Sequence, residues 1–372
     1  MTQANAAGFS GAAGSPAADA FYLPADNFRQ ARLWLPWPAS NSVLQAAMTT
    51  VVRAAAAFEP VSLLAAPGSE AAARAACGSD VDEIVPLAHA SLRLRDTGPT
   101  FLVDGKGGSA AVDWRFNGWG ARGDTSDVDL AHALLGVAEV RRFRAPLTLE
   151  GSSFVADGRG TVLALSSAVF DTARNPGLSQ MEAFSIFQGW LGAARVIWLP
   201  ERHPGDRLNT DVRALAAFAA PGVCVITAPG DHPVFTRTAD HLARTRDGLG
   251  MMLELVRLPA PPRGPRALPY PLSYTSFLPV NGGLLVPAFD APSDARAADM
   301  LAEVFPDRAI KLVPATLLAE SDLPLTSLAV PHPARLLERD RATVLPRSAW
   351  SQPATDAEGV LQHYADMADN ER

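Results

Sequence analysis

The chain has 372 residues, of which 48% are hydrophobic and 19% are charged, and its formal net charge is −7. This composition is typical of a cytoplasmic globular protein with a large core, and the length allows one closed domain of repeats or two ordinary domains. Because no basic surplus is available to replace counterions, the charge argues against a nucleic-acid partner. No apolar run approaches the ~20 residues that cross a bilayer, so we expect no membrane partner.

The two cysteines, Cys77 and Cys224, are too few for a disulfide framework and cannot build a zinc site alone. We expect no metal and no cofactor. Residues 1–20 are rich in Ala, Gly and Ser and lack the basic start and apolar block of a secretory signal, which predicts a disordered arm. Residues 348–372 are polar and predict a loosely attached tail. The folded domain is therefore expected at 21–347.

After an extended, proline-punctuated segment at 21–37, short apolar runs alternate with helical patterns. Apolar spacing of i, i+3, i+4 and i+7 predicts a helix at 44–55, and the capping-box spacing of Ser179 and Glu182 predicts the start of another. Further helices are expected at 69–77, 239–250 and 294–305. Strands are expected at 60–66, 82–87, 100–104, 110–116, 152–157, 160–169, 194–200, 215–220, 223–228, 252–258, 278–280, 283–289, 309–315 and 325–330.

Glycine-containing turns join several of these strands in pairs. The signals at 105–108, 157–160 and 281–282 are typical of hairpins. Hairpins and single helices then recur about five times with no break in composition. The proline-rich stretch 259–271 is the best linker candidate, and two α/β domains joined there are the alternative. We interpret it as a loop within one domain, because the same pattern resumes beyond it.

The stretch LRDTGPTFLVD at 94–104 places an Arg-Asp pair between two apolar runs. We interpret it as a strand end that carries Asp96 beside Arg95 and then turns at Gly98. A carboxylate in that position either pairs with a neighbouring cation of the chain or binds a ligand.

Several motifs taken together carry a resemblance. They are RDTGPTF at 95–101, VDWRFNGWG at 112–120, LEGSSFVADGRGT at 149–161, VIWLP at 196–200, FAAPGV at 218–223, SYTSF at 273–277, NGGLLVPAFDAPSD at 281–294 and FPDR at 305–308. In order and spacing they resemble the agmatine deiminase and bacterial peptidylarginine deiminase family, over about residues 23–333. The resemblance implies an α/β fold, the five-bladed propeller (pentein) of ββαβ units, as a single domain around a polar, negatively charged pocket.

The resemblance also implies a chemistry. Two carboxylates grip a guanidinium, a cysteine thiolate attacks its central carbon, ammonia leaves, and water hydrolyses the thiouronium intermediate. A histidine moves the protons and an aspartate orients it. The default reaction of the family converts agmatine to N-carbamoylputrescine, and related members convert arginine residues to citrulline.

The functional positions of the family carry over onto this sequence with changes. Asp96 and Glu150 match the two carboxylates that bind the substrate. Counting back from the FAAPGV motif places Asp211 at the catalytic histidine and Arg213 at its aspartate partner. Counting back from the last proline of SDLPLTSLAVPHP places Ser327 at the nucleophilic cysteine, on the last expected strand.

Further changes surround these positions. Arg93 stands where the family has a tryptophan, and Thr326 where it has the histidine before the nucleophile. The hydroxyl of Ser327 is far less acidic than a thiol and needs an adjacent base before it can attack. Asp211 is a weak base, and a neighbouring Arg213 lowers its proton affinity further. We therefore expect deiminase activity to be absent.

These changes lead to a hypothesis and two alternatives. The hypothesis is a cytoplasmic pseudoenzyme with a binding, scaffolding or regulatory role. The first alternative is an active guanidino deiminase, and the second is a hydrolase with changed chemistry that uses Ser327, Asp211 and Glu150. The expected partners are a guanidino compound or another small molecule, a second copy of the chain, or another protein.

The two carboxylates leave a further question open. Asp96 and Glu150 either still bind a guanidinium or another cation, or they pair with arginines of the chain itself. Arg93, Arg95 and Arg213 are the arginines expected to fill the site in the second case, which we favour.

Overall fold

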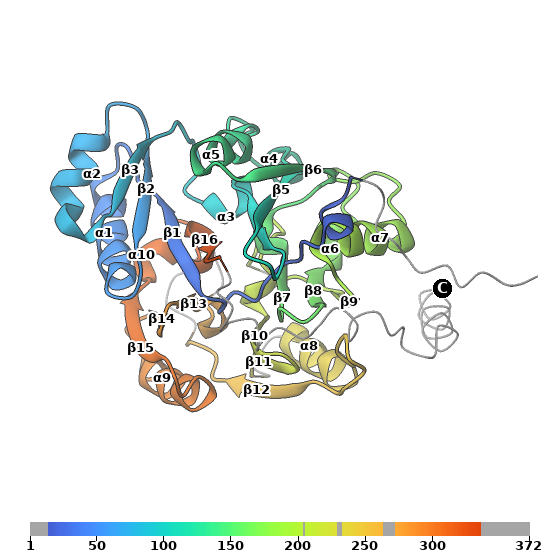
Figure 1. The fold of residues 1–372 in the computed structure, drawn as a ribbon. Coiled ribbons are helices and arrows are strands. Elements are labelled where there is room, and N and C mark those ends of the chain that lie inside the picture. Colours follow the sequence, from blue (N-terminus) through green and yellow to red (C-terminus); the bar gives the residue numbers. More distant parts are fainter. Residues whose placement is uncertain (1–13, 204, 229–232, 263–271, 336–372) are drawn as a thin grey trace, which may run out of the picture.

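The computed structural model describes residues 14–203, 205–228, 233–262 and 272–335. Most of the linker candidate and the whole of the predicted C-terminal tail lie outside the described residues. The described strands form five sheets that follow one another around a common centre, with the main helices on the outside (Figure 1). This arrangement confirms the predicted five-bladed α/β propeller.

Four of the sheets share one topology. The first strand is antiparallel to the second, and the second is parallel to the third, which the chain reaches through one or two helices. The strands are β4 (Thr100–Val103), β5 (Ser109–Arg115) and β6 (Arg141–Thr148); β7 (Phe154–Ala156), β8 (Thr161–Leu165) and β9 (Arg195–Leu199); β10 (Ala216–Ala220), β11 (Val223–Thr227) and β12 (Glu254–Leu258); β13 (Leu278–Val280), β14 (Gly283–Ala288) and β15 (Ala309–Pro314). Parallel strands need such crossovers, so each sheet is one ββαβ unit.

The fifth sheet joins the two ends of the described chain. Its order is β16 (Val330–Pro333), β1 (Gln30–Pro36), β2 (Val61–Ala65) and β3 (Glu83–Pro86). The late strand β16 is antiparallel to β1, with Val330 opposite Trp34, and so occupies the first-strand position of this sheet. The pairing closes the ring, and Figure 1 shows β16 beside β1 near the centre.

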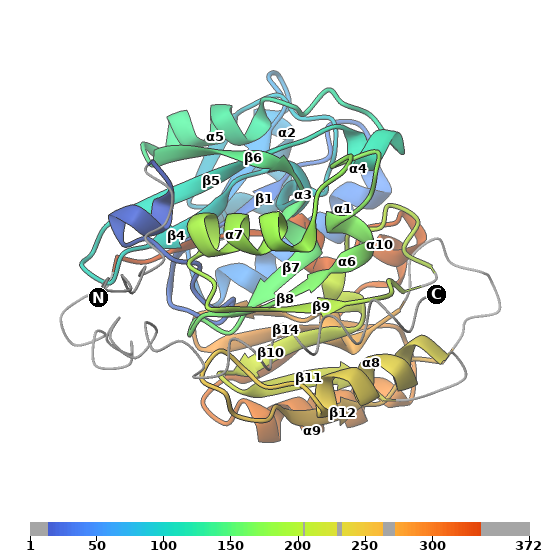
Figure 2. The same ribbon diagram turned by 90° about the vertical axis from the view of Figure 1, so that its right-hand side faces the viewer.

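The longer helices cover the outer parts of the sheets, as the side view also shows (Figure 2). They are α1 (Ser42–Ala56), α2 (Glu70–Cys77), α5 (Leu130–Ala138), α7 (Gln180–Leu191), α8 (Pro233–Ala243) and α9 (Ser293–Val304). The capping box at Ser179 and Glu182 is present, as predicted. The helix predicted at 239–250 is wrong in both bounds, because α8 starts at Pro233 and Asp247 accepts backbone hydrogen bonds that form a turn instead.

The hydrophobic core is divided among the spaces between neighbouring sheets. One buried cluster joins β4–β6 to β7–β9, the next joins β7–β9 to β10 and β11, and a third joins β10–β12 to β14 and α9. Two others join the sheet of β1 to the sheets on either side of it. Because each sheet buries both faces against its neighbours, the ring is one cooperative unit, which agrees with the single-domain interpretation.

The predicted N-terminal arm covers two different parts. Residues 1–13 lie outside the described residues, but 14–20 hold the 3-10 helix η1 (Pro16–Asp19), whose first residue is buried. Ser15 is fully buried and lies beside Gly189 of α7, where a Cβ would be 3.5 Å from its side chain. The disordered prediction is therefore wrong for 14–20, because small residues also permit close packing.

No helix in the described ranges is long and apolar enough to cross a membrane. Within the same ranges, no group of three or more His, Cys, Asp or Glu side chains is arranged to hold a metal ion.

Candidate functional site

Five short helical turns bring the site residues together. Each one directly precedes the first strand of a sheet: α3 (Leu94–Thr97) before β4, η3 (Gly151–Ser153) before β7, η4 (Val212–Ala214) before β10, η5 (Tyr274–Ser276) before β13 and η6 (Leu325–Leu328) before β16. Neighbouring turns touch one another, since α3 contacts both η6 and η3, and η4 contacts both η3 and η5. Equivalent positions of the ββαβ units therefore meet at the centre of the ring.

This arrangement corrects two expectations about local structure. Asp96 lies in the helical turn α3, not at a strand end, because Gly98 N–H donates to Leu94 O and Pro99 then ends the turn. Ser327 lies in the 3-10 turn η6, not in a strand, and its N–H donates to Pro324 O at 2.9 Å. Both motifs are too short for hydrophobic periodicity to distinguish a turn from a strand.

The carboxylate of Asp96 is bound by three side chains. Arg93 Nε donates to Oδ2 at 2.7 Å, Trp119 Nε1 donates to the same oxygen at 3.0 Å, and Thr210 Oγ1 lies 3.3 Å from it. The side chains of Arg93 and Asp96 are 4% and 0% exposed. Burial by itself would lower the pKa of Arg93, but the charge and hydrogen bond of Asp96 outweigh it and raise that pKa. Asp96 is therefore a paired carboxylate.

Glu150 is paired in a different way. Arg174 Nε donates to both carboxylate oxygens at 3.0 Å, and both side chains are fully buried. The guanidinium is held by Asp171 at 2.9 Å and by the carbonyl of Leu208 at 2.9 Å. Burial raises the pKa of Glu150 to about 7, although Arg174 opposes the shift. Arg174 was missed in the sequence, where it lies in a loop without a recognisable pattern.

Gly151 fixes the spacing between these two carboxylate-bearing turns. A Cβ at this position would lie 2.5 Å from the carbonyl oxygen of Arg95, which is closer than real contacts allow. The glycine after Glu150 is therefore needed for η3 to approach α3, and this brings Glu150 and Asp96 close enough for the charge of Asp96 to raise the pKa of Glu150 further.

The positions that the resemblance assigns to the histidine and its partner, Asp211 and Arg213, are also buried. Asp211 Oδ1 accepts from Arg213 N at 2.8 Å, and the Asp211 N–H donates to Asp206 at 2.9 Å. The Arg213 guanidinium turns away from Asp96 and Glu150 and pairs with Asp26, to which its Nε donates at 2.8 Å. The expectation that Arg213 pairs with one of the two substrate-type carboxylates is therefore wrong, whereas Arg93 does pair with Asp96.

Arg95, the other arginine expected at the carboxylates, also pairs elsewhere. Its Nη1 lies 3.3 Å from Asp26 and its Nε donates to Thr326 O at 2.9 Å. Adjacent residues on α3 thus point to different partners, Arg95 to Asp26 and Asp96 to Arg93. Asp26 was missed in the sequence because it lies in the N-terminal extended segment, far along the chain from both of its arginines.

Ser327 is fully buried, and its Oγ donates to the carbonyl of Pro324 at 2.8 Å. This hydroxyl is therefore bound to a backbone acceptor, which cannot serve as a general base. Neither cysteine supplies a thiolate, since both are buried and burial raises the pKa of Cys224 to about 12. Burial also raises the pKa of Cys77.

Comparison with known proteins identifies the family. The sequence model of the Porphyromonas-type peptidyl-arginine deiminase family matches residues 22–322. The chain is 36% identical over 318 residues to a putative agmatine deiminase of Streptomyces coelicolor, covering 79% of this chain and 94% of that protein. This chain belongs to the agmatine deiminase and peptidyl-arginine deiminase family.

Two further relatives agree with this placement. The chain is 30% identical to the agmatine deiminase of Pseudomonas putida, covering 81% of this chain and 92% of that protein. The fold matches the solved agmatine deiminase of Enterococcus faecalis with a TM-score of 0.82 and 23% identity, covering 87% of this chain and 99% of that one. The five-bladed architecture is therefore the pentein fold of these proteins.

Proposed function

We propose that this chain is a non-catalytic member of its family, a cytoplasmic pseudoenzyme with a binding, scaffolding or regulatory role. In this proposal Arg93 and Arg174 occupy the carboxylates that would otherwise bind a substrate guanidinium. We call this group of four residues, Asp96, Glu150, Arg93 and Arg174, the paired site.

One observation carries the proposal. Both carboxylates that the resemblance assigns to substrate binding form buried ion pairs with arginines of the same chain. In addition, the resemblance assigns Ser327, Asp211 and Arg213 to the positions of the thiol, the base and its orienting acid. The stretch matched by the family model also ends before Ser327. Losing a positioned base alone typically costs roughly 10²–10⁴-fold in rate, and here the nucleophile changes as well.

The free energy needed to break these buried ion pairs supports the same proposal. A guanidinium ligand would have to displace Arg93 or Arg174, which would leave that arginine buried without its carboxylate. Breaking a buried pair in this way costs about 3–5 kcal/mol. Since each 1.4 kcal/mol is a factor of ten, this corresponds to an affinity loss of roughly 10²–10³-fold or more.

The similarity to agmatine deiminases at 30–36% identity favours a second candidate, an active guanidino deiminase acting on agmatine or on arginine residues. It requires a nucleophile that replaces the thiol. A third candidate, a hydrolase using Ser327 with Asp211 and Glu150, is disfavoured because the Ser327 hydroxyl donates to Pro324 and Asp211 Oδ1 accepts from a backbone N–H.

Ammonia release tests the proposal. The purified chain would be incubated with agmatine, free arginine and a peptide ending in arginine, with a family member that carries the cysteine and histidine as positive control. We expect no ammonia or ureido product above the background without protein. Turnover that Ser327→Ala abolishes would support the hydrolase, and turnover that survives this change would support a deiminase with another nucleophile. Either result would overturn the proposal.

A further inference from the structure

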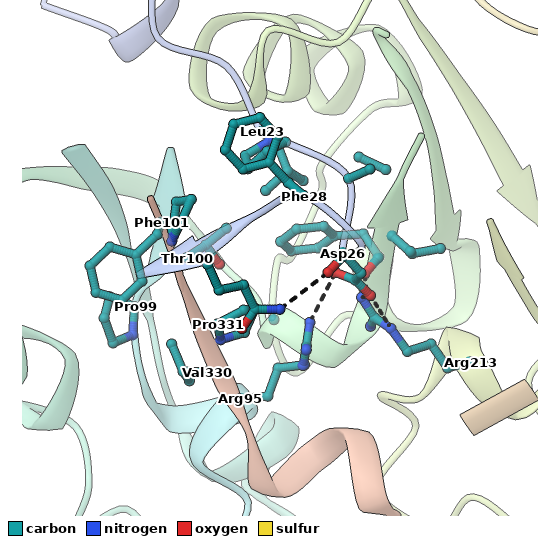
Figure 3. Close-up of a pocket in the computed structure, with 18 residues that line it drawn as sticks. Leu23, Asp26, Phe28, Arg95, Pro99, Thr100, Phe101, Arg213, Val330 and Pro331 are labelled. Carbon is teal, nitrogen blue, oxygen red and sulfur yellow. Dashed lines mark hydrogen bonds and ion pairs between the residues drawn. The ribbon is translucent and has the colours of Figure 1, made fainter. Parts of the chain in front are cut away.

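A second site lies beside the paired site, on the other side of Arg95 and Arg213. It is a pocket of about 550 Å³, including the part open to solvent, and β4, β7, β16 and the segment before β1 contribute to its walls. Its walls are mostly apolar and include Phe154. They also include Leu23, Phe28, Phe101 and Val330, which are labelled in Figure 3. We call it the axial pocket, because first strands of three sheets line it.

The charged lining of the axial pocket has more guanidinium than carboxylate. Arg95 and Arg213 approach Asp26 from two sides, as Figure 3 shows, and share this one carboxylate. No other charged residue is among the described residues that line the pocket. Burial, together with the like charge of Arg213, lowers the pKa of Arg95 to about 10, although Asp26 and Asp211 oppose the shift.

Two polar atoms of the lining residues have no hydrogen-bond partner among the described residues. They are Arg95 Nη2, a donor, and Gln30 Oε1, an acceptor. Arg95 and Gln30 are 8% and 5% exposed, so water satisfies these atoms poorly. A buried polar group without a partner costs about 1–3 kcal/mol, and more when charged. Both residues line the axial pocket, so a ligand that has an anionic group and a hydrogen-bond donor would supply the two missing partners.

We propose that the axial pocket binds a small organic carboxylate that has an apolar body and one hydroxyl or amino group. The carboxylate accepts from Arg95 Nη2, its hydroxyl or amino group donates to Gln30 Oε1, and the apolar body lies against Phe28 and Phe101. This site is distinct from the paired site and needs none of its four residues, so it does not depend on the absence of deiminase activity.

Calorimetry of the full chain with 3-phenyllactate tests this site. We expect saturable binding of one molecule per chain. Binding should fall at least tenfold for 3-phenyllactamide, which lacks the charge, and severalfold for 3-phenylpropionate, which lacks the hydroxyl. Phenethylamine, which carries the opposite charge, should not bind.

Two variants and one control variant locate the binding without removing the buried ion pairs. Ala25→Phe fills the pocket and should abolish binding, whereas Ala46→Phe makes the same change on the exposed surface of α1 and should leave binding unchanged. Gln30→Met removes the acceptor and should erase the preference for 3-phenyllactate over 3-phenylpropionate. Thermal unfolding of each variant establishes that it is folded. The inference is overturned if no carboxylate probe binds at millimolar concentration, if the amide binds as tightly as the acid, or if Ala25→Phe binds like the wild type.

Discussion

The paired site and the axial pocket are both built from arginines and carboxylates. They differ in the number of arginines for each carboxylate and in how far the side chains are exposed to solvent. In the paired site each carboxylate has an arginine of its own, with side chains at most 4% exposed. In the axial pocket two arginines share Asp26, whose side chain is 20% exposed, and a cavity adjoins them. The same turn, α3, contributes to both, because Arg95 lines the pocket and the next residue, Asp96, belongs to the paired site. The ratio of guanidinium to carboxylate groups therefore distinguishes a site whose charges are neutralised within the chain from one that can accept an anion.

Removing an arginine from the paired site should have the largest effect. Arg174→Met leaves Glu150 buried without its counter-charge, and we expect the free energy of unfolding to fall by about 3–5 kcal/mol. Urea denaturation measures it. The double change Arg174→Met with Glu150→Leu should recover most of the loss.

The matched control for this change is Arg122→Met. Arg122 pairs with Asp171 at 2.7 Å, but its side chain is 37% exposed, so its loss should cost less than about 1 kcal/mol. Equal effects of Arg122→Met and Arg174→Met would show that the burial of the pair does not matter.

Removing the shared carboxylate of the axial pocket should have a smaller effect that a ligand can reverse. Asp26→Asn leaves Arg95 and Arg213 without an anion, and since Asp26 is partly exposed we expect a loss of about 2–4 kcal/mol. Added 3-phenyllactate should raise the thermal midpoint of Asp26→Asn more than that of the wild type, because the anion replaces the missing charge. An identical shift in both proteins would contradict the shared-carboxylate description.

Glu59 differs from the carboxylates of both sites, because a backbone hydrogen bond stabilises its charged form more than the nearby guanidinium does. Its Oε2 accepts from Asn281 N at 2.8 Å, and burial raises its pKa from 4.5 to about 7 despite this hydrogen bond and the charge of Arg308. A carboxyl with a raised folded pKa binds its proton more tightly in the folded state. Its contribution to stability is therefore present below pH 4.5 and is lost as the pH rises through 7.

Glu59→Gln should remove this pH dependence. We expect the variant to gain on the order of 2 kcal/mol of stability relative to the wild type between pH 5 and 8. Urea denaturation at several pH values measures the difference. A variant whose stability runs parallel to that of the wild type over this range would show that Glu59 is ionised throughout.

Ser327→Ala should have the smallest effect. Its hydroxyl makes one hydrogen bond, to Pro324 O, so we expect a loss of about 1 kcal/mol or less. Ligand binding at the axial pocket should be unchanged. A drop in binding there would place Ser327 in the second site.

The fold could be predicted because its signals are repeated. Hairpin turns such as those at Asp157–Gly160 and Asn281–Gly282 mark the units, and the structure has strands on both sides of each turn. The closed ring was predicted from the family motifs, because hairpins alone do not specify it. The pairing of β1 with β16, which closes the ring, could not be predicted from local sequence patterns, because it joins residues about 300 positions apart.

The site could be predicted only in part. The motifs placed Asp96 and Glu150 at the centre of the ring, where the structure has them, and Arg93 pairs with Asp96 as expected. The partners Arg174 and Asp26 were not found, because ion pairs formed by loop residues depend on tertiary distances, which the spacing of residues along the sequence does not reveal. Arg213 was assigned to the wrong carboxylate for the same reason, since the direction of a long side chain is decided by the charges around it.

Calorimetric titration of the wild-type chain with agmatine determines whether the chain's own arginines occupy the paired site. We predict no saturable heat up to several millimolar agmatine, because a ligand must first break a buried pair. The contrary result would be binding of one agmatine per chain with a Kd below about 1 mM, corresponding to roughly −4 kcal/mol. If Asp96→Asn abolished this binding, agmatine and not Arg93 would occupy the carboxylate of Asp96.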